Sequence, residues 1–142
     1  MREGCRRLLN QVLFLDAMVQ SVSAAVWFKM TVPQRVTFRS AFENRMITSC
    51  QQQFAFYDGQ GVRLMGVRTP QADVMLATVR FGAEENGKLV TWMLRSFGTD
   101  TLRAVDIIAD GRSVIGDARS EFASVLESVN GDIEALIQYV QR

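Results

Sequence analysis

Asp106 and Asp110 are the pair of side chains in this sequence whose type and spacing come closest to catalysis. Two carboxylates act as general acid and base when both reach one reacting atom. The residues around them predict a β-strand, where positions four apart share a face but lie more than about 10 Å from each other. We therefore expect Asp106 to accept structural hydrogen bonds and Asp110 to start a turn with Gly111. A catalytic or metal-binding role for the pair is the less favoured interpretation.

The other candidate nucleophiles have no partners of the required type. The chain contains no histidine, which removes the usual general base and the commonest metal ligand. Ser113 lacks the Gly-x-Ser-x-Gly frame of a nucleophile elbow, so we expect a turn or capping hydroxyl. Cys50 falls on the apolar stripe of a predicted helix and is expected in the core. Cys5 and Cys50 form no CxxC pair, and whether they join in a disulfide stays open. We predict no enzyme, no catalytic residue, no metal and no cofactor.

Length and charge narrow the class of protein. A chain of 142 residues fits one domain, and its 16 basic and 15 acidic residues leave a net charge of +1. That balance is not typical of a nucleic-acid binder. No apolar run reaches the roughly 20 residues of a membrane span. The first seven residues lack the features of a signal peptide. The sequence is therefore that of a cytosolic protein or of a mature chain whose leader has been removed.

Helices are predicted at both ends of the chain. Apolar residues at helical spacing run from Leu8 to Leu15, and Asp16 is expected to cap a second helix that reaches Trp27. Thr31 and Gln34 have the spacing of a capping box, with Pro33 in the first turn. The helix that follows should end near residue 57, before the glycine-rich residues 58–61. Two further helices are predicted over 117–129 and 133–140, separated by Gly131-Asp132.

The middle of the chain predicts a sheet. Four runs rich in branched residues, at 62–67, 74–81, 89–95 and 102–108, have the length of strands. Turn residues separate them at 69–71, at 86–87 and at 98–100. Short turns join strands that are neighbours, so we expect a four-stranded antiparallel meander. With helices before and after it, the fold class is α+β.

The predicted strands carry bulky apolar residues on both faces. In the second strand, Val79 and Phe81 share one face, with Leu76 and Arg80 on the other. Either helices cover both faces, or one face lines a cavity. Arginines recur along the strands, and their guanidinium groups suit either a phosphate group at a cavity mouth or a solvated strand edge; these are Arg63, Arg80, Arg95 and Arg103.

Two segments resemble the Mla-type (toluene-tolerance) family of periplasmic lipid-binding proteins. The first is Trp27-Phe28-Lys29-Met30-Thr31-Val32-Pro33-Gln34-Arg35, followed by Phe38, Phe42 and residues 57–59. It is similar to the family's tryptophan, its Thr-Pro-x-Gln-Arg and its long helix. The second is residues 105–115, with Arg119-Ser120-Glu121-Phe122 and residues 131–137 after it. The chain departs from the family pattern at Val26, Leu102 and Ala118, which bears on the shape of the cavity.

The resemblance implies a single lipid-binding domain over residues 1–142, without a leader and part of an N-terminal helix. It implies a soluble periplasmic carrier that shuttles phospholipid between inner- and outer-membrane complexes. The implied partners are the membrane-anchored lipid-binding subunit of an ABC transporter and an outer-membrane lipoprotein complex. The implied cargo lies in an apolar cavity between the helices and the sheet, lined by Phe42, Met46, Val79, Phe81, Trp92, Met93, Val105, Ile107, Phe122 and Leu126.

Three alternatives remain open. A related branch of the family is associated with hopanoid loci. A small cone-shaped α+β enzyme acting on a hydrophobic substrate would share the fold class, but the missing histidine weighs against it. A packed adaptor with no cavity is the third.

Overall fold

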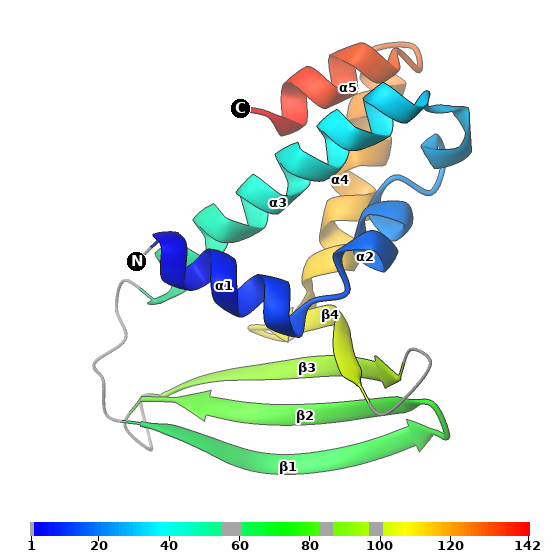
Figure 1. The fold of residues 1–142 in the computed structure, drawn as a ribbon. Coiled ribbons are helices and arrows are strands. Elements are labelled where there is room, and N and C mark those ends of the chain that lie inside the picture. Colours follow the sequence, from blue (N-terminus) through cyan, green and yellow to red (C-terminus); the bar gives the residue numbers. More distant parts are fainter. Residues whose placement is uncertain (1, 55–60, 83–86, 97–100) are drawn as a thin grey trace.

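The structure is a computed structural model that describes residues 2–54, 61–82, 87–96 and 101–142 (Figure 1). Helices precede and follow a sheet, which confirms the predicted α+β class. The N-terminal elements are α1 (Arg2–Val12), α2 (Leu15–Val22), the 3-10 helix η1 (Trp27–Lys29) and α3 (Val32–Phe54). The strands are β1 (Val62–Gln71), β2 (Val74–Phe81), β3 (Lys88–Ser96), β4 (Leu102–Ala109) and β5 (Arg112–Ser113). The chain ends with α4 (Val114–Ser128) and α5 (Ile133–Val140).

The sheet is the antiparallel meander that the turn residues predict, in the order β1-β2-β3-β4-β5. Strand β5 adds two residues to the four predicted strands. Strand β1 continues to Gln71, so the predicted turn at residues 69–71 is wrong, and the turn falls at residues 72–73. Pro70 is tolerated within the strand because β1 lies at the edge of the sheet. The predicted turns at 86–87 and 98–100 lie largely outside the described residues.

Two helix starts test the capping predictions. The Thr31 amide donates to Gln34 Oε1 (2.9 Å) and the Gln34 amide donates to Thr31 Oγ1 (3.2 Å), which confirms the capping box before α3. The predicted cap at Asp16 is wrong, because α2 already begins at Leu15 without a side-chain cap. Asp16 instead accepts from Arg39 Nε of α3 at 2.8 Å.

The C-terminal helices follow from local turn chemistry. Asp110 and Gly111 have φ of +54° and +74°, which confirms the predicted turn between β4 and β5. Ser113 Oγ then accepts from the Gly116 amide (2.8 Å) and caps α4. The helix begins at Val114, three residues before its predicted start. Gly131, with φ of +80°, separates α4 from α5, and the Asp132 side chain caps α5.

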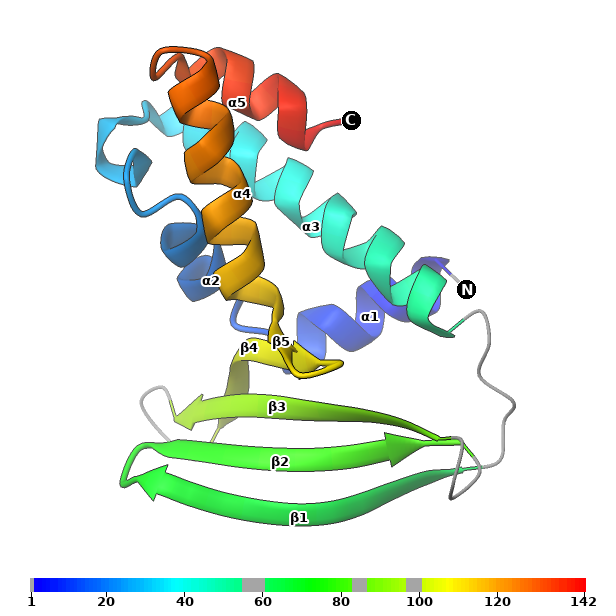
Figure 2. The ribbon, with the colours of Figure 1, turned by 180° about the vertical axis from the view of Figure 1, so that it is seen from behind.

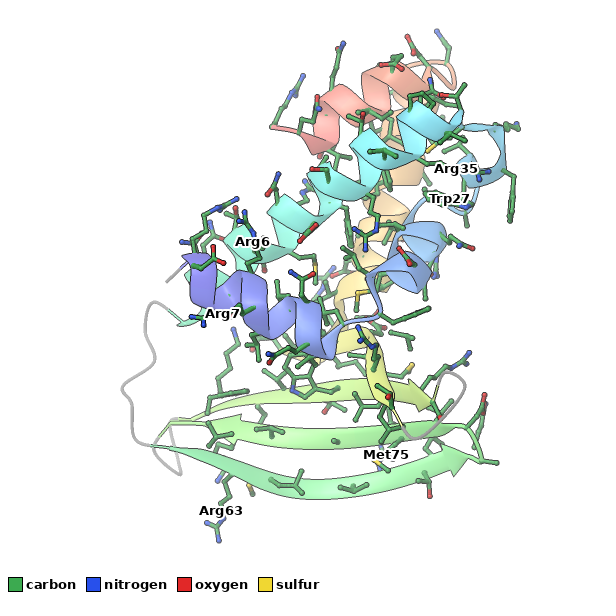
Figure 3. All side chains as sticks on the ribbon, in the orientation of Figure 1. Arg6, Arg7, Trp27, Arg35, Arg63 and Met75 are labelled. Carbon is green, nitrogen blue, oxygen red and sulfur yellow. A yellow bond between two sulfur atoms is a disulfide. The ribbon has the colours of Figure 1, made fainter. Side chains whose placement is uncertain are left out.

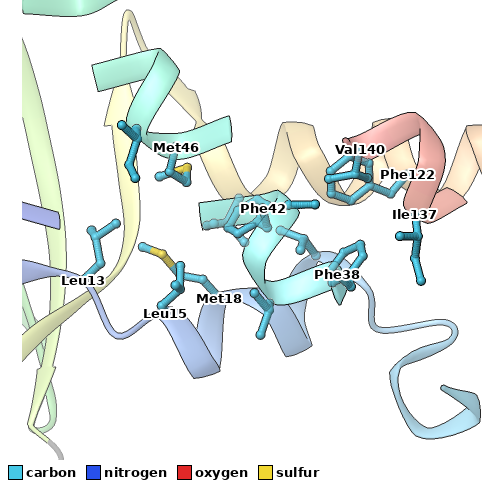
Figure 4. Packing of buried hydrophobic residues seen from close by; sticks show 14 of the residues in the cluster. Leu13, Leu15, Met18, Phe38, Phe42, Met46, Phe122, Ile137 and Val140 are labelled. Atoms are coloured by element: carbon cyan, nitrogen blue, oxygen red, sulfur yellow. The ribbon is translucent and has the colours of Figure 1, made fainter. Parts of the chain in front are cut away.

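The buried core lies among the helices. Phe122 of α4 meets the rings of Phe38 and Phe42 of α3 edge to face, at centroid distances of 5.9 and 6.4 Å (Figure 4). The helices meet the sheet at β4, where Ala104 is fully buried. The Phe14 amide donates to the Ala104 carbonyl (2.8 Å) and ties the segment between α1 and α2 to that strand. Strands β1 and β2 extend away from the helices (Figures 1 and 2).

A disulfide between Cys5 and Cys50 joins α1 to α3 with a Cα–Cα distance of 6.0 Å. This pairing answers the question that the sequence left open. Cys50 is buried as predicted, but as half of a covalent bond rather than as a free thiol.

Among the described residues, the helices include none with the length and apolar character to cross a membrane.

Candidate functional site

The strand register assigns each sheet residue to one of two faces, because directly paired residues on neighbouring strands share a face. Trp92 of β3 pairs with Ala77 of β2 and with Ile107 of β4. Counting outward from these pairs defines the inner face as Val62, Leu64, Val67, Met75, Ala77, Val79, Phe81, Lys88, Val90, Trp92, Leu94, Ser96, Leu102, Ala104, Ile107 and Ala109.

The inner face is apolar along β1 to β4, apart from Lys88 and Ser96 at the two ends of β3, and on β5 Arg112 pairs with Ala109. It faces the helices, since Ala104 belongs to the helical core and Trp92 and Ile107 pack against that core. Exposure rises with distance from β4: Ala104 is 0 % exposed, whereas Leu64 on β1 is 61 % exposed. The apolar surface therefore extends beyond the part that the helices cover.

The outer face has a different composition. It comprises Arg63, Gly66, Arg68, Gln71, Val74, Leu76, Thr78, Arg80, Leu89, Thr91, Met93, Arg95, Arg103, Asp106 and Ile108. The hydroxyls of Thr78 and Thr91 lie 2.9 Å apart across two strands. All ten residues of β1 are exposed, so helices do not cover both faces of the described sheet. The sheet is instead amphipathic. The sequence did not reveal this, because apolar residues occur on both faces.

The structure brings together four of the sheet residues predicted to contact lipid. Val79, Phe81, Trp92 and Ile107 all lie on the inner face. Met93 lies on the outer face, where it pairs with Leu76 and Asp106.

Val105 falls at a register shift in the ladder between β3 and β4. Met93 pairs with Asp106 and the next residue, Leu94, pairs with Ala104, so Val105 is the extra residue of a bulge. The shift matters because it keeps Ala104 on the inner face and Asp106 on the outer face, although the two residues are only two positions apart.

The four helical residues predicted to contact lipid are buried in the core. Phe42, Met46, Phe122 and Leu126 are each less than 10 % exposed. Phe42 and Met46 also border a groove of about 1030 Å³ between α3, α4 and α5. The ten predicted residues are thus divided among the inner face, the outer face, a bulge and the helical core.

The groove is more polar than the inner face. Polar residues of α3 line it at spacings of three and four, namely Thr37, Ser40, Asn44 and Thr48. Arg45 and Glu121 also line it, and Arg45 Nη2 and the Tyr139 hydroxyl both donate to Glu121 Oε2, at 2.8 and 2.5 Å. Partial burial raises the pKa of Glu121, but these hydrogen bonds and the charge of Arg45 outweigh it and lower the pKa overall. Sequence reasoning missed the groove, although the polar spacing along α3 was its signal.

The candidate catalytic carboxylates have structural contacts. Asp106 accepts from Ser113 Oγ (2.5 Å) and from the Ile115 amide (3.1 Å), which confirms its predicted structural role. Asp110 is exposed and lies 3.8 Å from Lys88 Nζ. The described residues include no group of three or more metal-ligating side chains.

Comparison with known proteins agrees with the geometry. The family described as MlaC protein matches residues 1–142. Among solved structures, the fold is similar to that of a phospholipid-binding protein from Ralstonia solanacearum in complex with a phospholipid, with a TM-score of 0.82. That likeness covers 99 % of this chain and 80 % of the other at 14 % sequence identity, so it shows a shared fold. No curated protein matches the sequence. Because the family match runs the whole length of the sequence, the chain belongs to the MlaC protein family.

Proposed function

We propose that this protein binds a phospholipid and carries it through the periplasm, with the acyl chains against the inner face of the sheet. The observation that carries the proposal is the continuous apolar inner face, which remains exposed at Val62, Leu64 and Val67 of β1. Burial of one Val or Leu side chain is worth about 1.5–3 kcal/mol, so an apolar ligand has a strong reason to cover this row. Family membership supports a phospholipid as that ligand.

The partners follow from the cost of exposing acyl chains. At about 0.8 kcal/mol per CH₂, two chains represent on the order of 20 kcal/mol when they enter water. Release therefore needs an acceptor that offers a continuous apolar path. We infer that the acceptors are a membrane-anchored lipid-binding subunit of an ABC transporter on one side and an outer-membrane lipoprotein complex on the other. No step of this transfer needs a catalytic residue, a metal or a cofactor.

The helical residues have a secondary part in this proposal. Phe42, Met46, Phe122 and Leu126 pack against one another and against their neighbours in the core. Contact between these side chains and a lipid on the inner face requires the helices to move. We therefore assign first contact with the acyl chains to Val79, Phe81, Trp92 and Ile107.

The direct test is organic extraction and mass spectrometry of protein purified without detergent. We expect phospholipid at close to one molecule per chain. Repeated extracts without lipid would contradict the carrier function.

Two exposed leucines on opposite faces test the location of the acyl chains. Leu64 lies on the inner face and Leu89 on the outer face, and they are 61 % and 46 % exposed. We expect Leu64→Glu to lower lipid content at least tenfold, because a carboxylate against an acyl chain loses its hydration. Leu89→Glu should retain lipid, and both variants should melt within a few degrees of wild type. Lipid content is measured by extraction, and stability by circular dichroism.

Met93→Glu tests whether the acyl chains contact Met93, as the sequence predicts, or lie on the opposite, inner face of the sheet. The register puts Met93 beside Asp106 on the outer face, so we expect this variant to keep its lipid if it folds. Loss of lipid from a folded Met93→Glu protein, with full lipid on Leu64→Glu, would place the acyl chains on the outer face.

A further inference from the structure

The outer face of the sheet concentrates basic charge. The five strands contain seven basic residues and one acidic residue, although the whole chain has 16 and 15. The sheet is therefore basic, because almost all acidic residues lie in the helices and turns. Five of the seven basic residues lie on the outer face, and they are Arg63, Arg68, Arg80, Arg95 and Arg103.

These arginines are placed beside one another. Arg63 pairs directly with Arg80, and Arg95 pairs directly with Arg103. Like charges directly opposite each other destabilise a sheet. Arg68, Arg80 and Arg95 form no ion pair with another described residue, and Arg80 Nε is buried without a hydrogen-bond partner there. An external anion would relieve the repulsion.

Within the described part of the strands, the outer face carries far fewer acidic than basic side chains. Asp106 is the acidic residue that the strand register places there. Its carboxylate already accepts from Ser113 Oγ and the Ile115 amide at the start of α4. Arg103 is held beside α1, where Nη1 donates to the Asn10 carbonyl at 3.3 Å. The outer-face charge thus touches α1 at the β4 end, through Arg103, whereas Arg63 on β1 points away from the helices in Figure 3.

We propose that the outer face and edge strand β1 dock onto the surface of an anionic phospholipid bilayer. Strand β1 is amphipathic, with Leu64 and Val67 on the inner face and Arg63 and Arg68 on the outer face. Guanidinium groups bind phosphate oxygens, and long basic side chains place their apolar stems along the acyl region. Docking in this orientation puts the open edge of the inner face at the bilayer, where a lipid enters or leaves without crossing water.

The distribution of charge favours a bilayer over an acidic protein. The arginines lie at both ends of the sheet, with Thr78, Thr91 and Leu76 between them. Phosphates are spread over the whole surface of a bilayer, so dispersed arginines can contact it without matching a particular spacing of acidic groups. The purpose of this docking rests on the proposed carrier function, but binding to vesicles does not depend on cargo.

The test removes two exposed arginines from the outer face and two basic residues from elsewhere. Arg68→Gln/Arg95→Gln is compared with the charge-matched control Arg6→Gln/Lys29→Gln, whose residues are exposed on α1 and η1. Each protein is sedimented with vesicles of phosphatidylcholine alone or with a quarter phosphatidylglycerol, at low ionic strength. Each basic residue near such a surface contributes about a fivefold factor. We expect the outer-face variant to bind anionic vesicles roughly 30-fold more weakly than wild type, and the control to bind within about threefold.

Three results would overturn the proposal. They are no binding of wild type to anionic vesicles, equal binding by both double variants, and equal binding of wild type to neutral and anionic vesicles. A protein that fails on vesicles but is captured by an acidic protein partner also rules out the bilayer as the occupant. Lipid extraction from the same samples keeps the carrier function separate: unchanged lipid content with lost vesicle binding supports both proposals, and absent lipid with normal vesicle binding contradicts only the carrier.

Discussion

Asp106 joins the sheet to the C-terminal helices through one carboxylate. One oxygen accepts from the Ser113 hydroxyl, and the other accepts from the Ile115 amide. The Ser113 hydroxyl accepts in turn from the Gly116 amide. The sequence predicts a structural role for Asp106 because strand spacing separates it from Asp110. It does not predict the partners, because they come from a hairpin and a helix start whose relative placement depends on the fold.

Removal of this carboxylate should destabilise the protein. Asp106→Ala leaves the Ile115 amide and the Ser113 hydroxyl without their acceptor, which we expect to lower the free energy of unfolding by about 2 kcal/mol. Urea denaturation followed by circular dichroism measures the change. Asp110→Asn is the control, because Asp110 is exposed and its ion pair with Lys88 is long. We expect it to change stability by less than about 0.5 kcal/mol and lipid binding by no more than a few-fold. Turnover of a substrate by wild type, lost in a folded Asp110→Asn variant, would instead support an enzyme.

Helix α1 is an element with little core of its own. Its buried residues are Cys5 and Leu9. The disulfide and hydrogen bonds from Arg2 tie it to α3, and the bond from Arg103 to the Asn10 carbonyl ties it to β4. In Figures 1 and 2 it lies between α3 and the sheet. The sequence predicts the helix from its apolar spacing, but it leaves the disulfide open, since spacing along the chain does not show proximity in space.

The disulfide should contribute strongly to stability. Cys5 and Cys50 are 45 residues apart in the sequence, and the loss of chain entropy on closing such a loop gives a stabilisation of about 4 kcal/mol. We expect Cys5→Ser/Cys50→Ser to lose a substantial part of that stability, as measured by urea denaturation under oxidising conditions. Wild type in excess reductant should match the double variant. Equal stability of the variant and oxidised wild type would contradict a structural role for the bond.

Helices α3, α4 and α5 meet at the Glu121 carboxylate, which should make part of the stability depend on pH. The pKa of Glu121 is lowered from its ordinary 4.5 in the folded protein. A lowered folded pKa adds stability above the unfolded value, and this stability is lost as pH falls through the folded pKa. We expect Glu121→Gln to be less stable than wild type at pH 7 and the difference to shrink below about pH 4.5. Thermal melts of both proteins across that range measure it, and a difference that grows in acid would contradict the assignment.

At the scale of the whole molecule, the sequence predicts elements better than it predicts faces. Branched runs and turn residues indicate all four long strands, and capping residues indicate the start of α3. Alternation cannot tell which side of the sheet the helices cover, because Leu76 and Met93 on one side are as apolar as Val79 on the other. That choice is made where β4 packs on the helices. Register shifts at residues 65 and 105 then change which neighbours share a face, and single-strand patterns do not reveal such shifts.

The irregular register of β1 has a consequence for solubility. A long, straight strand at a sheet edge offers its amides and carbonyls as a template on which another copy of the chain adds a strand, and repeated addition produces fibrils. Strand β1 combines such an edge with exposed apolar side chains, which is the most hazardous composition for this growth. Its two register shifts, at Leu64/Gly66 and Arg68/Gln71, break the regular spacing of backbone donors, and Pro70 lacks an amide hydrogen altogether. The distortions of the strand thus let an apolar edge stay open to lipid while its backbone is a poor seed for aggregation.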